Sequence, residues 1–139
     1  MRKIFDAPWS WLQSEQAFYI YEDCLYFKEY KHYQARVASY KNNQDIRCLC
    51  CSDGEEKIGI VVYQLSNDHT AEILGIAIHK SYRNRGNGKY LLQKSFESLR
   101  LQKVIVETSG TVGKFFEHSG FRLEEIYNSG SNLYIYELD

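Results

Sequence analysis

The stretch RNRGNGK at residues 83–89 lies between two segments whose apolar patterns indicate the fold. It follows a mostly apolar run at 71–79, long enough for a buried strand, and precedes apolar residues at helical spacing from 87 to 100. A further short apolar run lies at 103–107. A strand, a helix and a strand with short links form a βαβ unit, whose two strands are parallel and whose crossover is right-handed. The stretch therefore follows the carboxyl end of a buried strand, where open α/β sheets bind ligands.

The same loop has three properties of an anion-binding site. Gly86 and Gly88 allow a tight turn and a close backbone approach to a ligand, and the helix start offers free N–H groups and a positive dipole end. No Asp or Glu occurs from 73 to 96, whereas five Lys or Arg do, so this window carries +5 and the rest of the chain −6. The loop is not a Walker motif, because Tyr90 follows Lys89, and it lacks the third glycine of a dinucleotide fingerprint. We predict that it binds a small polyanion.

Other patterns predict two hairpins and further helices around this unit. The Asp53-Gly54 turn separates two β-rich runs, which predicts an antiparallel pair. A helix that ends at Ser119-Gly120 has a common C-terminal signature. In chain order, the expected elements are one or two helices within 9–41, strands at 46–51 and 58–65, a turn at 66–70, a strand at 71–79, a helix at 87–100, a strand at 103–107, a helix at 111–118, and a closing hairpin of 121–127 and 133–138.

Length and composition are those of one globular domain over 1–139. The 139 residues are 44% hydrophobic and 25% charged with a single proline, which excludes a disordered or collagen-like chain. A formal net charge of −1 argues against nucleic acid as a partner, although Arg83, Arg85 and Lys89 keep a weaker nucleic-acid hypothesis open. No run approaches the roughly 18 apolar residues of a membrane helix, and polar residues interrupt 1–12 where a signal peptide needs an apolar run. We expect a cytoplasmic protein that does not bind membranes.

Tyrosine and cysteine are unevenly distributed. Two interpretations fit the tyrosines before position 41: an amphipathic layer whose phenol groups reach water, or an aromatic-walled substrate pocket. Cys48 and Cys50 fall on one face of a strand and Cys51 on the other, with no second Cys or His pair at zinc spacing. We expect these thiols and Cys24 to be buried and reduced, without metal or redox chemistry. The clustered tyrosines are Tyr19, Tyr21, Tyr26, Tyr30, Tyr33 and Tyr40.

The motif Arg83-x-x-Gly86-x-Gly88 resembles the acetyl-CoA signature of the GNAT superfamily of acyl-CoA-dependent N-acetyltransferases. AEILGIAI at 71–78 resembles its fourth strand, and KFFEHSGF at 114–121 resembles its late helix and the Gly-Phe after it. The resemblance covers roughly 46–138. It implies an α/β (α+β) fold in one domain, with a mixed, mostly antiparallel sheet of six to seven strands. A central parallel pair at 71–79 and 103–107 would splay apart, and about four helices would flank the sheet.

The resemblance also implies where acetyl-CoA binds as the acyl-donor co-substrate, with no metal. The pantetheine arm would lie between the splayed strands and pair with the backbone of Ile76 and Ile78. Amides of 83–89 would hold the pyrophosphate, and cationic side chains would reach the adenosine phosphate. The implied cofactor-binding residues are Ile76, Ala77, Ile78, Arg83, Asn84, Arg85, Gly86, Asn87, Gly88, Lys89 and Phe116.

The implied reaction moves the acetyl group from acetyl-CoA to a primary amine by direct attack in a ternary complex. A lysine-like amine with a pKa near 10.4 is neutral in only about one molecule in 10³ at pH 7, so a nearby base helps. The position of Glu72 resembles that of the base in the histone-acetyltransferase branch, which makes Glu72 the candidate base, directly or through water. The alternative interpretation is a solvated carboxylate at a strand end. The N–H of Ile76 would stabilise the oxyanion of the tetrahedral intermediate.

Phe116 departs from the family pattern, because many members have Tyr there to protonate the departing CoA thiolate. A thiolate whose pKa is near that of cysteine, about 8.5, is a fair leaving group without such an acid. Tyr82, Tyr90 and Ser119 are nearby in sequence as substitute donors, and His118 fits a cation at a helix C-terminus. The alternative function is a catalytically weak or inactive CoA-binding sensor or regulatory module.

The sequence leaves the acceptor open as a small-molecule or peptide amine. In this fold class the acceptor site draws on the early helices and the terminal hairpin, where the sequence patterns are least clear. A homodimer that pairs through the closing hairpin is also open.

Overall fold

The computed structural model describes residues 1–25, 28–66 and 69–138. Within them, one seven-stranded sheet has the order β1-β2-β3-β4-β5-β7-β6. Among the described strands, β4 and β5 are parallel and every other neighbouring pair is antiparallel, which confirms the predicted mixed sheet. The strands are β1 (Arg2–Asp6), β2 (Ile46–Asp53), β3 (Glu56–Ser66), β4 (Thr70–Ile78), β5 (Lys103–Ser109), β6 (Arg122–Ile126) and β7 (Ser131–Glu137).

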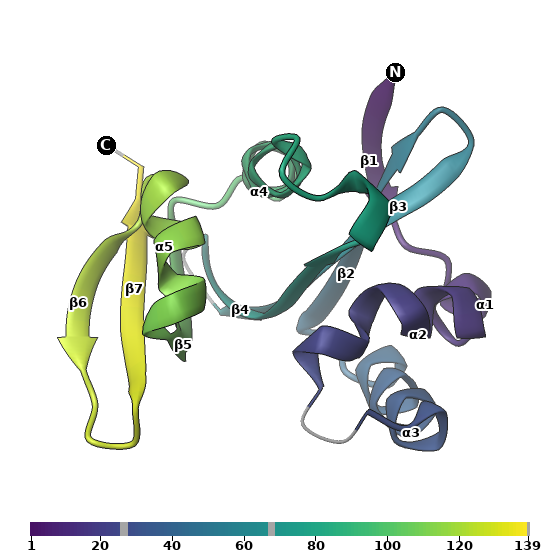
Figure 1. Cartoon of the computed structure of the whole chain (residues 1–139), viewed down its shortest axis with the longest axis horizontal. Coiled ribbons are helices and arrows are strands. Elements are labelled where there is room, and N and C mark those ends of the chain that lie inside the picture. Colours follow the sequence, from purple (N-terminus) through teal and green to yellow (C-terminus); the bar gives the residue numbers. More distant parts are fainter. Residues whose placement is uncertain (26–27, 67–68, 139) are drawn as a thin grey trace.

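Helices cover both faces of this sheet, with α1–α3 against one face of β1–β4 and α4 above the other face (Figure 1). The remaining strands of the sheet, β5, β6 and β7, have α5 packed on one face (Figure 1). The described helices are α1 (Trp9–Leu12), α2 (Glu15–Tyr21), α3 (Tyr30–Lys41), α4 (Asn87–Ser98) and α5 (Gly110–His118), with short 3-10 turns η1 (Glu22–Cys24) and η2 (Lys80–Tyr82). Among these helices, none combines the length and apolar character that crossing a membrane requires.

The segment 9–41 differs from the expected one or two helices. It contains three described α-helices and η1. α2 begins three residues after α1 ends, and the Ser14 side chain caps its start by accepting a hydrogen bond from the Ala17 N–H. Because such a restart depends on one capping side chain, the continuous helical spacing of the apolar residues does not reveal it.

The strand β1 was not expected from the sequence. It pairs antiparallel with β2, with Arg2 opposite Asp53 and Asp6 opposite Leu49. Of its five residues only Ile4 and Phe5 are apolar, so the strand lacks an apolar run. Charged side chains are common on edge strands, where they oppose further pairing.

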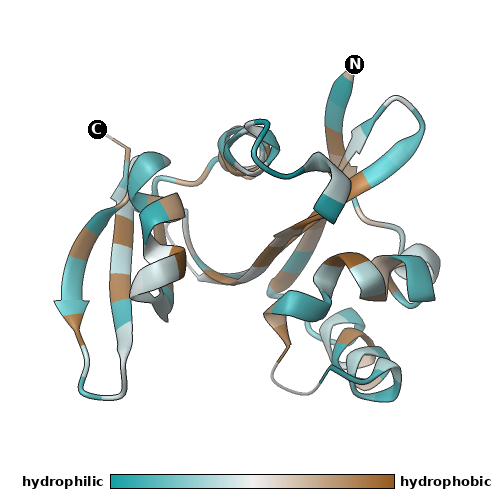
Figure 2. Ribbon diagram, in the orientation of Figure 1, coloured by the Kyte–Doolittle hydropathy of each residue, from teal (hydrophilic) through white to brown (hydrophobic). Residues whose placement is uncertain are grey.

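The described residues form two hydrophobic cores, one on each face of the sheet. The α1–α3 core contains Cys48 and Cys50, and the core under α4 and α5 contains Cys51, which confirms the predicted faces of these thiols. Figure 2 shows brown bands alternating with paler ones along β7. Burial raises the pKa of the Cys50 thiol to about 12, so it stays protonated at neutral pH.

The tyrosine-rich segment belongs mainly to the α1–α3 core. Tyr21 and Tyr33 are 2% and 1% exposed, and their hydroxyl groups are inaccessible to solvent. This differs from the expectation that the phenol groups reach water, although Tyr19 is 58% exposed. Of the described tyrosines between 19 and 40, none lines the large cleft discussed below, and Tyr26 lies outside the described residues.

Several expected turns are confirmed by backbone conformation. Gly54 joins β2 to β3 with φ +64°, and Gly120 follows α5 with φ +97°, both in the region that glycine tolerates best. The expected turn at 66–70 includes positions 67 and 68, which lie outside the described residues.

The parallel strands β4 and β5 separate soon after they begin. Their register pairs only Thr70–Glu72 with Lys103–Ile105, so the predicted splay is confirmed. The β3–β4 ladder skips Leu74, because Val62 is opposite Gly75 and Tyr63 is opposite Ile73. This bulge exchanges the two faces of β4: Ile73 belongs to the α4 and α5 core, whereas Ala77 belongs to the α1–α3 core.

Candidate functional site

A cleft of about 770 Å³ lies where β4 and β5 separate. Its walls come from β4 and β5, from the loop at 83–89 with the start of α4, from α5, and from Asp23 and Cys24 of η1. This volume is within the usual range of small-molecule sites. This cleft therefore lies where the sequence predicted a ligand site.

Most of the residues predicted to bind a cofactor line this cleft. Of the described residues proposed for the site, Arg85 and Glu72 lie outside its lining. The Arg85 guanidinium is 5.9 Å from the centre of the Tyr82 ring. The predicted residues that line the cleft are Ile76, Ala77, Ile78, Arg83, Asn84, Gly86, Asn87, Gly88, Lys89 and Phe116.

The loop at 83–89 owes its shape to two residues in the left-handed region of φ. Asn84 has φ +62° and Gly86 has φ +78°, and Gly86 precedes the first residue of α4. Gly88 has a different role, because a Cβ there would lie 2.8 Å from the Phe115 ring. Gly86 therefore sets the turn, and Gly88 allows α4 to approach α5 closely.

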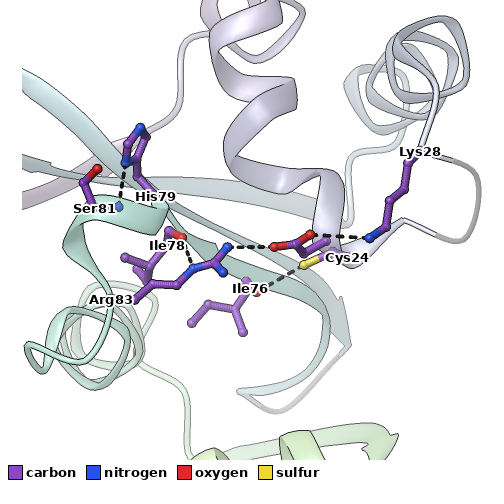
Figure 3. A network of polar contacts seen from close by, with 8 residues as sticks. Cys24, Lys28, Ile76, Ile78, His79, Ser81 and Arg83 are labelled. Atoms are coloured by element: carbon purple, nitrogen blue, oxygen red, sulfur yellow. Dashed lines mark hydrogen bonds and ion pairs between the residues drawn. The ribbon is translucent and has the colours of Figure 1, made fainter.

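The edge of β4 that faces the cleft presents the backbone of Ile76 and Ile78. The Cys24 thiol donates a hydrogen bond to the Ile76 carbonyl at 3.1 Å, and Arg83 Nε donates to the Ile78 carbonyl at 2.8 Å (Figure 3). In a strand the N–H and C=O of one residue project to the same side, so both N–H groups also face this edge. A chain-like ligand with amide groups can pair with it as a further strand would.

An ion pair joins this edge to η1. Arg83 Nη2 donates to Asp23 Oδ2 at 2.8 Å, and Lys28 Nζ lies 3.5 Å from Asp23 Oδ1. The hydrogen bond from Arg83 lowers the pKa of the Asp23 carboxyl, so the pair is present at neutral pH. Sequence spacing gave no signal for this contact, because Asp23 and Arg83 are 60 positions apart.

Two carboxylates flank the point where the strands separate. Glu72 is opposite Ile105 in the last described pair of the β4–β5 ladder, directly before the strands separate. Glu107 is two residues beyond Ile105, on the same face of the sheet, and it lines the cleft. Ser131 Oγ donates to Glu107 Oε2 at 3.0 Å. Glu107 was not among the residues predicted from the sequence, although its place at the end of an apolar strand was a usable signal.

Phe116 lies at the wall of the cleft and is 2% exposed. The nearby hydroxyl groups considered as substitute donors all donate elsewhere: Tyr82 to Glu56 at 2.5 Å, Tyr90 to the Arg2 carbonyl at 2.9 Å and Ser119 to the Phe115 carbonyl at 3.0 Å. His118 is the last residue of α5 and lines the cleft. Burial raises the pKa of the Cys24 thiol to about 11, so its S–H is a neutral donor at this wall.

Comparison with protein families gives one match over most of the chain. The model described as "Acetyltransferase (GNAT) family" matches residues 5–121. Among curated proteins, none matches the sequence.

Many solved structures have the same fold. PaiA N-acetyltransferase from Thermoplasma acidophilum in complex with coenzyme A has a TM-score of 0.78 at 14% identity, covering 99% of both chains. The ribosomal-protein-S18-alanine N-acetyltransferase from Escherichia coli has 0.76 at 17%, covering 100% of this chain and 95% of its own. A spermidine N-acetyltransferase chimera from Vibrio cholerae and hSSAT has 0.74 at 16%, covering 98% and 95%. At these identities the likeness establishes the fold.

Proposed function

This chain belongs to the GNAT family of acetyltransferases, and from that premise we propose that it transfers acetyl from acetyl-CoA to a primary amine in a ternary complex. The observation that carries the proposal is the β4 edge. The backbone of Ile76 and Ile78 faces a cleft that leads to the 83–89 loop at the start of α4. An extended amide chain followed by phosphates matches this sequence of groups.

The residues present fit acetyl-CoA as the donor substrate. Ile76 and Ile78 offer amide and carbonyl groups to the pantetheine arm along β4. The loop at 83–89 contributes amides near the N-terminus of α4, whose dipole favours pyrophosphate oxygens. Lys89 lines the same part of the cleft and adds positive charge there. Acetyl-CoA supplies the activated thioester, and the chain supplies binding and orientation.

We assign removal of the amine proton to Glu72, acting through water. Glu72 lies at the closed end of the splay, outside the lining of the cleft in this structure, which favours a bridging water over direct contact. Glu107 is a second candidate, because it lines the cleft on the same face of the sheet. The Ile76 N–H would then donate to the thioester oxygen as negative charge develops on it.

We propose that the CoA thiolate leaves without a dedicated acid. Phe116 has no proton to give, and the hydroxyls of Tyr82, Tyr90 and Ser119 donate to other groups. A thiolate with a pKa of about 8.5 tolerates this loss. General acids contribute roughly 10²- to 10⁴-fold, so we expect slow turnover.

A thiol-release assay tests the function. Acetyl-CoA is mixed with a panel containing a polyamine, peptides with free N-termini, amino acids and an aminoglycoside, and free CoA is measured together with the acetylated product. We expect amine-dependent CoA release with at least one class. Calorimetric binding of acetyl-CoA without transfer to any amine would instead support the alternative, a CoA-binding sensor.

A further inference from the structure

We propose that Arg2 is a positioning residue for the acetyl-CoA site. Pairing of β1 with β2 brings Arg2 beside the start of α4. Arg2 Nη1 donates to Asn87 Oδ1 at 3.2 Å, and its guanidinium carbon is 4.2 Å from the centre of the Tyr90 ring. The Tyr90 hydroxyl donates back to the Arg2 carbonyl at 2.9 Å. Arg2 Nη1 also donates to the Gly86 carbonyl at 3.5 Å. Four contacts thus attach β1 to the start of α4.

Asn87 transmits this attachment across the loop. Its Nδ2 donates to the Tyr82 carbonyl at 2.8 Å while its Oδ1 accepts from Arg2. The residues between these points, 83–86, include the left-handed Asn84 and Gly86. One side-chain amide therefore ties the two ends of the turn together, and Arg2 fixes the orientation of that amide.

The surroundings of Asn87 make the contact matter. With Arg2 in place, Asn87 is only 6% exposed, so its Oδ1 depends on the Arg2 guanidinium for a hydrogen bond. Leaving a buried acceptor unpaired costs more than an average hydrogen bond contributes. The turn at 83–86 would rearrange to relieve this, and its amides would lose the orientation that a pyrophosphate needs.

Arg2 acts through Asn87 and not as a phosphate ligand. Although Arg2 is a described residue, it is not among those that line the cleft. Its guanidinium contacts Asn87, the Tyr90 ring and, at 3.5 Å, the Gly86 carbonyl. A positioning role affects every ligand that uses the loop amides. A direct contact with the adenosine phosphate would affect only ligands that carry that phosphate.

This inference rests on the proposed use of acetyl-CoA, and calorimetry with two ligands tests it. Acetyl-CoA and its 3′-dephospho form are titrated into wild type, Arg2→Ala, Arg2→Lys and Lys3→Ala. Lys3→Ala is the matched control, because this substitution removes the same charge from the next position of β1, whose side chain points to the opposite face of the strand. We expect Arg2→Ala to weaken the binding affinity for both ligands equally, by roughly 3- to 10-fold. Lys3→Ala should bind like wild type, and Arg2→Lys should lie between, since it keeps the charge and loses the planar fork.

A double-mutant cycle with Asn87→Ala completes the test. The bond from Arg2 to Asn87 is shorter than its 3.5 Å contact with the Gly86 carbonyl, so Arg2 acts mainly through Asn87. The double variant should therefore bind within about 2-fold of Asn87→Ala alone. Wild-type affinity in both Arg2 variants would overturn the inference. So would a loss confined to acetyl-CoA, which would make Arg2 a phosphate ligand, and so would an equal loss in Lys3→Ala. A wild-type protein that binds neither ligand would contradict the proposed function itself.

Discussion

Arg83 and Asp23 form a 2.8 Å ion pair that joins the 83–89 loop to η1 across the β4 edge. The same guanidinium donates to the Ile78 carbonyl, while Cys24 donates to the Ile76 carbonyl. The carbonyls proposed to receive the pantetheine amides are therefore already occupied by side chains of the chain itself. In the proposed binding mode, acetyl-CoA would displace these contacts or share the two carbonyls with them, since a carbonyl oxygen has two lone pairs.

Asp23→Asn should strengthen acetyl-CoA binding. The substitution breaks the ion pair and removes a negative charge from the lining of the cleft, where phosphates would be repelled by it. Because both partners are partly exposed, we expect a gain of about 2- to 5-fold in the calorimetric affinity. Glu22→Gln is the control, since it removes the same charge from the same 3-10 turn. Weaker binding by Asp23→Asn would mean that the pair supports the site.

Gly86→Ala should lose both stability and cofactor affinity. With φ +78° at Gly86 and no atom within 4 Å of an added Cβ, the expected penalty is conformational alone, about 1 kcal/mol in the free energy of unfolding. Gly54→Ala is matched in φ and in open space but lies in the β2–β3 turn. Denaturation should show a similar decrease in the free energy of unfolding for the two variants, and only Gly86→Ala should bind acetyl-CoA more weakly. Equal affinities would exclude the loop as the binding site.

Glu72→Gln should lower turnover most near neutral pH. If Glu72 removes the amine proton, the loss is on the order of 10²- to 10⁴-fold at pH 7 and shrinks as the pH approaches the pKa of the amine. A pH profile of kcat/KM for both Glu72→Gln and Glu107→Gln measures this. An unchanged profile for Glu72→Gln with a pH-dependent loss for Glu107→Gln would transfer the role to Glu107.

Cys24 should react slowly with alkylating agents, and acetyl-CoA should protect it. Its raised pKa of about 11 keeps the thiolate fraction at pH 8 roughly 10²-fold below that of an ordinary cysteine. The rate should rise about tenfold per pH unit from 8 to 10. Mass spectrometry after iodoacetamide treatment measures the rate, with Cys24→Ser as the control. If acetyl-CoA does not slow the modification, then acetyl-CoA does not cover Cys24 when it binds, which would contradict the proposed binding mode.

The sequence predicted the parts of the fold that depend on local patterns. The βαβ unit follows from periodicity on either side of the 83–89 loop, and the hairpin turn follows from Asp53-Gly54. By contrast, β1 was not predicted, because an edge strand with two apolar residues resembles a charged loop in sequence. The 3-10 turn η1 was not predicted either, because its residues show no apolar periodicity.

The candidate site was predictable where one segment supplies it. The loop and the Ile76–Ile78 edge are contiguous in sequence, so motif spacing located them. Contacts that the tertiary fold creates could not be foreseen: Asp23 reaches Arg83 over 60 positions and Arg2 reaches Asn87 over 85. Charge counting also treated Arg83 as a free cation, whereas it is paired with Asp23.

The bulge at Leu74 gives β4 two phases within nine residues. Before it, odd-numbered side chains enter the core under α4 and α5; after it, odd-numbered side chains enter the α1–α3 core. Deleting Leu74 would restore a single phase, and either Ile73 or Ala77 would then exchange its core for the opposite face. The deletion would also change the position of the Glu72 carboxylate relative to the backbone edge at Ile76. A one-residue insertion or deletion in this strand should therefore be far more damaging than any single substitution in it.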